Sequence, residues 1–152
     1  MQPEVARTSI AFRPLLAADH PACVRLWAAS DGVAMRTWQD AAALERLLAR
    51  NPSLCWAAHH EGQLVATVLC GHDGWRGWLY HVAVAPAWRR RGIATALVVR
   101  AQTELARAGV PRVHALVLAG NREATQFWRA AGWKMREDLS VVGAELDAPY
   151  VN

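Results

Sequence analysis

The chain carries three consecutive arginines, Arg89, Arg90 and Arg91, directly before Gly92 and an apolar helical pattern that begins at Ile93. Because a helix leaves its first backbone N–H groups unpaired, this junction presents donors at a place where an anion could sit. The helix dipole adds partial positive charge there, and glycine lets a ligand approach the backbone closely. The junction therefore predicts a phosphate or pyrophosphate site, with the alternative that the three arginines are simply solvated.

The sequence around the arginines differs from the common phosphate-binding loops. It has neither the GxxxxGK[ST] pattern of a P-loop nor the GxGxxG pattern of a dinucleotide fold. A run of three basic residues is also shorter than the roughly 5–8 residues typical of nucleic-acid patches. The formal charge of +4 suits either an anionic partner or an ordinary surface. We expect no nucleic-acid partner.

Candidate acid–base groups lie on the segment before the arginines. Strand alternation predicts that Trp78, Tyr80, Val82 and Val84 share one face, opposite His81. On that face Tyr80 could relay a proton through water or line a pocket. His81 is expected to pack elsewhere or to lie on the surface.

The histidines and cysteines are not spaced like metal ligands. His59 and His60 are adjacent, so on a strand they point to opposite faces and cannot join Cys55 or Cys70 around one ion. The three cysteines are far apart and lack a CxxC spacing, which argues against a disulfide frame and favours a reducing compartment. We therefore expect no metal.

Apolar periodicity and breakers place these candidates on strands and helices. Helices are predicted after an Asp19 cap and over Ala41–Ala49, Ile93–Ala108 and Asn121–Ala131, where Gly132 follows. Strands are predicted over Thr8–Arg13, Leu54–His60, Gln63–His72, Trp78–Val84 and Arg112–Leu118, with one or two more in the remainder. Glu61 and Gly62 are expected to close a hairpin.

This order of elements predicts an α+β or mixed α/β sheet with helices on its faces. The 152 residues show no repeat or linker, so we expect a single domain over residues 1–152. No apolar run approaches the ~20 residues that cross a bilayer, and the first residues lack a signal-peptide pattern. The protein is expected to be cytoplasmic, with no membrane partner.

Two sequence blocks resemble the GNAT superfamily of N-acetyltransferases. The first is Val84-Ala85-Pro86 followed by Arg89-Arg90-Arg91-Gly92-Ile93-Ala94, which is similar to the family's V-x-P and [RQ]-x-x-G-x-[GA]. The second is Asn121-x-x-Ala124-x-x-Phe127-Trp128-x-x-x-Gly132-Trp133, which is similar to N-x-x-A-x-x-[LF]-Y-x-x-x-G-[FYW]. Both stand in the family's order, and Gly71–Ala85 resembles a subgroup of small bacterial members, the YpeA-like proteins.

The resemblance implies a central, mostly antiparallel sheet in which two neighbouring parallel strands splay apart around acetyl-CoA. The backbone of Val82, Ala83 and Val84 would then pair with the cofactor's amide-bearing arm. The resemblance assigns its pyrophosphate to Arg89, Arg90, Arg91, Gly92, Ile93, Ala94 and Thr95. Asn121 would bond the arm or cap the following helix, and both roles are compatible.

The chemistry implied by the family is attack of a neutral amine on the thioester, with an acid protonating the departing thiolate. Trp128 departs from the pattern, because most members carry a tyrosine there and an indole N–H donates without usable acidity. Trp128 could stabilise the thiolate by hydrogen bonding, or another group or water could supply the proton. A third interpretation is a non-catalytic protein that binds or senses acyl-CoA.

The loop over residues 30–38 maps onto the segment that covers the acceptor pocket in many GNAT members. We hypothesise that Asp31 attracts an ammonium group and Arg36 a carboxylate, which would favour a small molecule, amino acid or peptide terminus as the amine acceptor. Exposed loop charges without a ligand are the alternative. Family members are often dimers, so a homodimer is compatible with the resemblance.

Overall fold

The computed structural model describes residues 9–33 and 40–146, and its centre is a five-stranded sheet. The strands follow chain order, with antiparallel neighbours from the first to the fourth and a parallel fourth and fifth. They are β1 (Ala11–Pro14), β2 (Trp56–His60), β3 (Gln63–His72), β4 (Gly77–Val84) and β5 (Val113–Ala115). The mixed α+β class expected from the sequence is confirmed.

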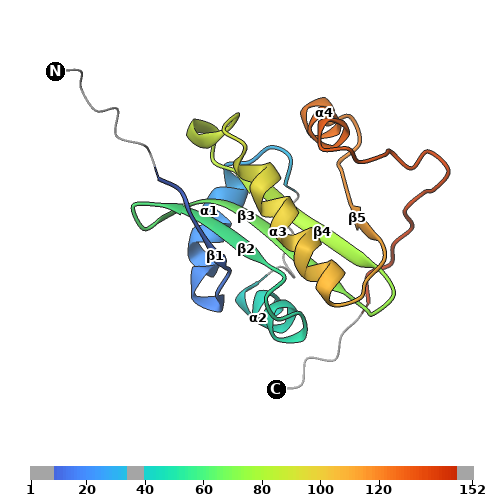
Figure 1. Cartoon of the computed structure of the whole chain (residues 1–152), viewed down its shortest axis with the longest axis horizontal. Helices are drawn as coiled ribbons and strands as arrows, with labels where there is room; N and C mark the ends of the chain where they lie inside the picture. The colour runs from blue at the N-terminus through green and yellow to red at the C-terminus, as the bar shows by residue number, and fades with distance from the viewer. Residues whose placement is uncertain (1–8, 34–39, 147–152) are drawn as a thin grey trace. The chain divides into compact units, whose positions relative to one another are not determined.

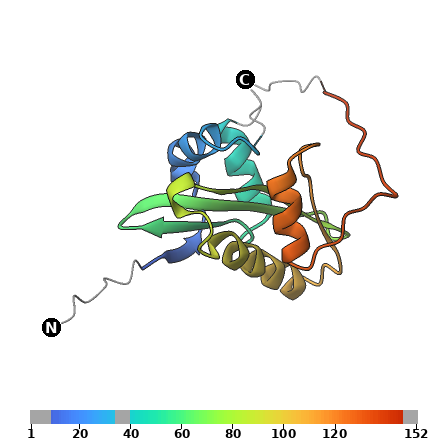
Figure 2. The same cartoon turned by 90° about the horizontal axis from the view of Figure 1, so that it is seen from above.

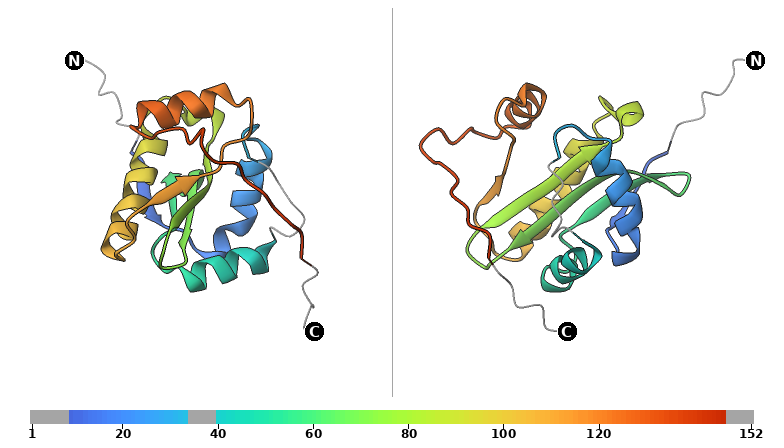
Figure 3. Two further views of the ribbon diagram at one scale, coloured as in Figure 1. Left: turned by 90° about the vertical axis from the view of Figure 1, so that its right-hand side faces the viewer. Right: turned by 180° about the vertical axis from the view of Figure 1, so that it is seen from behind.

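Helices cover both faces of this sheet. On one face lie α1 (His20–Ala28) and α2 (Ala41–Arg50), and on the other lies α3 (Ile93–Arg107), as Figures 1, 2 and 3 show from different sides. The α1 and α2 face buries a core of Leu15, Cys23, Leu26, Trp27, Leu44, Cys55, Ala57, Leu69 and Ala83. The opposite layer is built on the buried α3 residues Ile93, Leu97, Val98, Ala101 and Leu105. Burial of these two apolar layers fixes the sheet that carries the site.

The predicted side-chain cap of α1 by Asp19 is not observed. Asp19 ends the 3-10 helix η1 (Ala17–Asp19) and precedes α1, but its side chain does not cap α1. Its carboxylate instead accepts two 2.7 Å hydrogen bonds from Arg13 and one from Leu16 N. An arginine fork matches both carboxylate oxygens, so it outcompetes a single backbone donor. Asp40 supplies a true cap for α2, accepting from Ala43 N at 2.8 Å.

The predicted hairpin is confirmed, because β2 and β3 pair on either side of Glu61 and Gly62. The predicted helix over 93–108 ends one residue earlier, at Arg107. The strand predicted over Arg112–Leu118 is shorter, and Leu116 and Leu118 beyond it are exposed. Thr8, the predicted start of the first strand, lies outside the described residues.

Residues 122–146 belong to a second compact unit, distinct from the unit that ends at Asn121. This second unit contains α4 (Arg122–Ala130), close to the predicted helix over 121–131. The prediction of strands in the remainder is wrong for residues 133–146, where no strand forms. Apolar side chains in this segment, such as Val142, which is 92% exposed, pack against no buried strand. Their β propensity alone is therefore not sufficient to form a strand.

None of the helices in the described ranges is long and apolar enough to cross a membrane. The single domain and the cytoplasmic location stay predictions. So does the absence of a metal, although within residues 9–33 and 40–146 no group of three metal-ligating side chains comes together.

Candidate active site

The parallel strands β4 and β5 separate part-way along β4. Their pairing runs from Gly77 with Val113 to Leu79 with Ala115 and goes no further. Because β4 continues to Val84, its residues 80–84 present a strand edge that β5 has left, and Figure 1 shows the two strands diverging. A strand edge carries backbone donors and acceptors that an extended, amide-bearing ligand can pair with. The predicted Val82, Ala83 and Val84 lie on this open edge.

A β-bulge interrupts β4 where the open edge begins. On β3, Thr67 pairs with Ala83 and Leu69 with Tyr80, so Val68 faces both His81 and Val82. His81 adopts a left-handed φ of 47°, which is uncommon for a residue with a side chain. The extra residue shifts the alternation, so the prediction that Tyr80, Val82 and Val84 share one face is wrong.

In the observed register Tyr80 pairs with Leu69 and Ala83 pairs with Thr67. Leu69 and Thr67 lie two residues apart on β3, so Tyr80 and Ala83 share the face that α1 and α2 cover. Val84 pairs with Ala66 and points to the opposite, α3 face. Tyr80 itself is 37% exposed at the border of this layer. Burial raises the pKa of its hydroxyl above the ordinary value, so Tyr80 stays protonated and can donate a hydrogen bond.

His114 joins the Tyr80 face from the neighbouring strand. It pairs with Trp78 across β4 and β5, and the two rings lie 5.0 Å apart between centroids. Trp78 is two residues before Tyr80 and lies on the same face of the sheet. The His114 imidazole, the Trp78 indole and the Tyr80 phenol therefore share one face, where β4 and β5 begin to separate. The sequence alone does not single out His114, because its place beside Trp78 depends on which strand becomes the neighbour of β4.

Residues 89–92, the arginine loop, turn the backbone from η2 (Pro86–Trp88) into the start of α3. Arg90 and Gly92 have left-handed φ values of 63° and 76°, and Gly92 is the N-cap of the helix. The first helical hydrogen bond runs from Ala96 N to Gly92 O at 3.0 Å, so the N–H groups of Ile93, Ala94 and Thr95 precede the helical ladder. Left-handed turns of this kind gather successive N–H groups around an anion-sized concavity.

Two of the three arginine side chains brace this loop. Arg89 Nε donates to Val84 O at 3.1 Å, which ties the loop to the end of β4. Arg91 lies 4.7 Å from the Trp88 ring centroid and donates to Ala87 O at 3.3 Å. Arg90 is exposed. The loop therefore combines a fixed backbone with cationic side chains, an arrangement suited to a phosphate or pyrophosphate.

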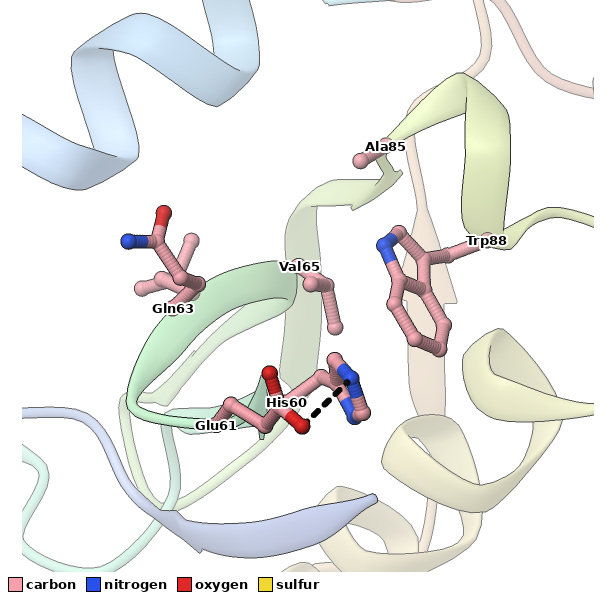
Figure 4. A pocket seen from close by; sticks show the side chains of 7 residues that line it. His60, Glu61, Gln63, Val65, Ala85 and Trp88 are labelled. Carbon is pink, nitrogen blue, oxygen red and sulfur yellow. Dashed lines mark ion pairs between the residues drawn. The ribbon is translucent and has the colours of Figure 1, made fainter. Parts of the chain in front are cut away.

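A pocket of about 450 Å³ lies beside the arginine loop, next to the 3-10 helix η2 (Pro86–Trp88). The Trp88 and His60 rings lie 4.5 Å apart between centroids with their planes tilted by 42°, and His60 Nε2 lies 3.8 Å from Glu61 Oε1. Figure 4 shows these side chains along the pocket wall. Trp88 thus contacts His60 on β2 and Arg91 in the loop. Trp88 is therefore both a wall of the pocket and the ring on which the Arg91 guanidinium lies.

Trp128 lies on α4 in the second unit, where it is buried. Its ring contacts Phe127 at 5.0 Å and Trp133 at 4.4 Å between centroids, and Trp133 N donates to Trp128 O at 2.9 Å. The turn at Gly132 thereby folds Trp133 back onto α4. These contacts fix the indole within an aromatic cluster.

The predicted acceptor residues are only partly described. Asp31 is exposed in the turn after α1, whereas Arg36 lies outside the described residues. Asn121 reaches the same turn, because its Nδ2 lies 2.7 Å from where a Cβ on Gly32 would stand. The three cysteines are buried, and burial raises the pKa of Cys23 and Cys70 to about 12, so neither is a thiolate near neutral pH.

Comparison with known proteins identifies the class to which this fold and loop belong. Residues 14–133 match the acetyltransferase (GNAT) family. The chain is 30% identical over 129 residues to an acetyltransferase of Sodalis glossinidius, covering 84% of this chain and 89% of that one. It is 38% identical over 104 residues to an acetyltransferase of Pectobacterium atrosepticum, covering 68% and 72%.

A solved structure supports the same fold. The PaiA N-acetyltransferase of Thermoplasma acidophilum, in complex with coenzyme A, superimposes with a TM-score of 0.73 at 16% identity over 84% of this chain and 91% of that one. The chain belongs to the GNAT family and is an acetyl-CoA-dependent acyltransferase. The YpeA-like subgroup stays a prediction.

Proposed function

We propose that this acyltransferase moves the acetyl group of acetyl-CoA to a primary amine of a small molecule, amino acid or peptide, by direct attack while both substrates are bound. The observation that carries the proposal is the open edge of β4, which continues through η2 into the arginine loop. A single elongated ligand with amides at one end and a pyrophosphate further along fits both features in that order.

The residues present fit acetyl-CoA at two places. The edge at Val82, Ala83 and Val84 would pair with the amides of its arm. The N–H groups of residues 92–95 would take its pyrophosphate, with Arg89, Arg90 and Arg91 supplying charge. When bound, acetyl-CoA supplies an activated acetyl thioester; the chain itself contributes orientation, which alone lowers the barrier substantially.

The acceptor amine approaches from the face that carries Tyr80 and His114. A protonated amine must lose a proton before it can attack, and an imidazole has a proton affinity suited to accepting it near neutral pH. His114 is therefore our proposed base. Tyr80 holds its own proton, so it orients the amine or a water by hydrogen bonding.

Charges at the loop after α1 would select the acceptor. Asp31 is exposed there and suits an ammonium group, and Arg36 would complement a carboxylate. Asn121, which reaches Gly32, would link this loop to the arm of acetyl-CoA. Trp128 would donate its indole N–H to the departing thiolate, which is a fair leaving group and receives its proton from water.

The experiment that tests this function is an amine panel. The purified chain is incubated with carbon-13-labelled acetyl-CoA and primary amines that carry, or lack, a carboxylate. Thiol release is followed continuously, and mass spectrometry identifies labelled products. We expect equal amounts of thiol and N-acetylated amine for at least one class. Saturable acetyl-CoA binding with no acetylated amine across the panel would contradict the proposal and favour an acyl-CoA sensor.

A further inference from the structure

The bulge in β4 is held by a buried side chain on the neighbouring strand. Thr67 of β3 has no solvent exposure, and its hydroxyl donates to His81 O at 2.9 Å. The same hydroxyl accepts from Trp27 Nε1 of α1, also at 2.9 Å. The left-handed residue of the bulge is thus tied through Thr67 to a helix on the α1 and α2 face.

The direction of this hydrogen-bond chain is fixed by its members. An indole N–H can only donate, so Thr67 must accept from Trp27. The single hydroxyl proton of Thr67 is then available for the His81 carbonyl, which can only accept. The His81 ring also lies edge-on to Trp27, with centroids 4.5 Å apart at 90°. Burial lowers the pKa of His81, in keeping with a neutral ring in this packing.

The hydrogen bonds from Trp27 to Thr67 and from Thr67 to His81 determine where Val82 N–H points. His81 C=O and Val82 N–H belong to one planar trans peptide, so they point to opposite sides. Because His81 C=O is directed towards Thr67 on β3, Val82 N–H is directed away from β3. That direction is towards the edge that β5 leaves open after Leu79.

We propose that Thr67 and Trp27 are positioning residues for acyl transfer, which hold the His81 peptide so that Val82 N–H faces the thioester carbonyl. The inference rests on the proposed function, because it takes the open edge of β4 as the acetyl-CoA site. Neither side chain touches the reacting atoms. They act by preventing rotation of one peptide, and a preorganised donor stabilises the oxygen on which charge develops.

The test uses the one chemical difference between acetyl-CoA and CoA, which is the acetyl group. Thr67→Val keeps the shape of the side chain but removes both hydrogen bonds, and Thr67→Ser keeps the hydroxyl as the matched control. Calorimetric titrations of each protein with acetyl-CoA and with CoA give four comparisons with the parent chain. Circular dichroism checks that each variant is folded.

We expect Thr67→Val to bind acetyl-CoA about 3- to 10-fold more weakly, the range for loss of one neutral hydrogen bond, with CoA affinity unchanged. Thr67→Ser should behave like the parent chain. Equal weakening for both ligands, or no change for either, would overturn the inference, since a merely structural role does not distinguish an acetyl group. A parent chain that binds neither ligand would instead refute the proposed function.

A second measurement keeps the inference testable should Thr67→Val fail to fold. Nitrogen-15 spectra of the parent chain report the Val82 amide directly, with saturating acetyl-CoA and with saturating CoA. We expect this amide to shift downfield with acetyl-CoA relative to CoA. An identical Val82 shift with both ligands would overturn the inference.

Discussion

The proposed pyrophosphate site at the start of α3 can be tested with two glycines that flank this helix, Gly92 before it and Gly109 after it. Gly92 begins α3 with φ 76°, and Gly109 follows its end with φ 77°. A Cβ added at either position would meet no atom within 4 Å. Alanine therefore costs only backbone strain, about 1–2 kcal/mol for a left-handed residue with a side chain. Gly92→Ala and Gly109→Ala should destabilise the chain by the same amount.

The two variants should differ in how they bind acetyl-CoA. At position 92 a methyl group would enter the concavity from which the pyrophosphate approaches, and relaxation of φ would turn the adjacent N–H groups away. Loss of one hydrogen bond to a charged group corresponds to about 1.5–3 kcal/mol, or about 10- to 100-fold in affinity. At position 109 no ligand contact is proposed, so affinity should equal that of the parent chain.

Urea unfolding measures the stability of both variants, and calorimetry at fixed salt measures their affinity for acetyl-CoA. Both variants must be measured, because an effect of backbone strain on binding would appear in both of them. Affinities that fall equally, or that stay unchanged in Gly92→Ala, would refute the assignment of the pyrophosphate to this loop. Matched stability with a selective loss at position 92 would support it.

Three further predictions address acid–base chemistry and stability. Trp128→Tyr, which introduces a phenol, should raise kcat about 10-fold or more by supplying an acid, whereas Trp128→Phe should not; steady-state thiol release compares them. His114→Gln should lower kcat/KM at pH 7 about 100-fold, with acetyl-CoA affinity unchanged, as steady-state rates and calorimetry would show. The hydrogen bond from Arg13 holds the pKa of Asp19 below its ordinary value, so this carboxylate stabilises the fold above about pH 4 and the contribution disappears as pH falls through the lowered pKa. Asp19→Asn should therefore cost about 1 kcal/mol at pH 7 and progressively less as pH falls below about 4 in urea unfolding; a constant difference would contradict this cause.

Local sequence patterns were sufficient for the elements that frame the site. The apolar period and the glycine at 92 locate the start of α3, and Glu61-Gly62 locates the hairpin. These features depend on neighbours in the chain, so they can be read without knowing the fold. The junction of β4 with the arginine loop follows from the same local signals.

Features that depend on pairing could not be predicted from the sequence. Alternation assumes one residue opposite one residue, so it misplaced the faces of Val82 and Val84 once His81 was bulged. The contact of Trp27 with Thr67 joins residues 40 positions apart. His114 becomes a candidate base only because β5 is the neighbour of β4. Each of these features is set by tertiary contact.

A crystal structure of the chain with CoA would decide where the cofactor binds. We expect the pyrophosphate to lie within hydrogen-bonding distance of the N–H groups of residues 92–95. We also expect the amide-bearing arm to pair with Val82–Val84, where β5 has left β4. CoA bound elsewhere, for example in the pocket beside Trp88, with the β4 edge bare, would refute the proposed acetyl-CoA site.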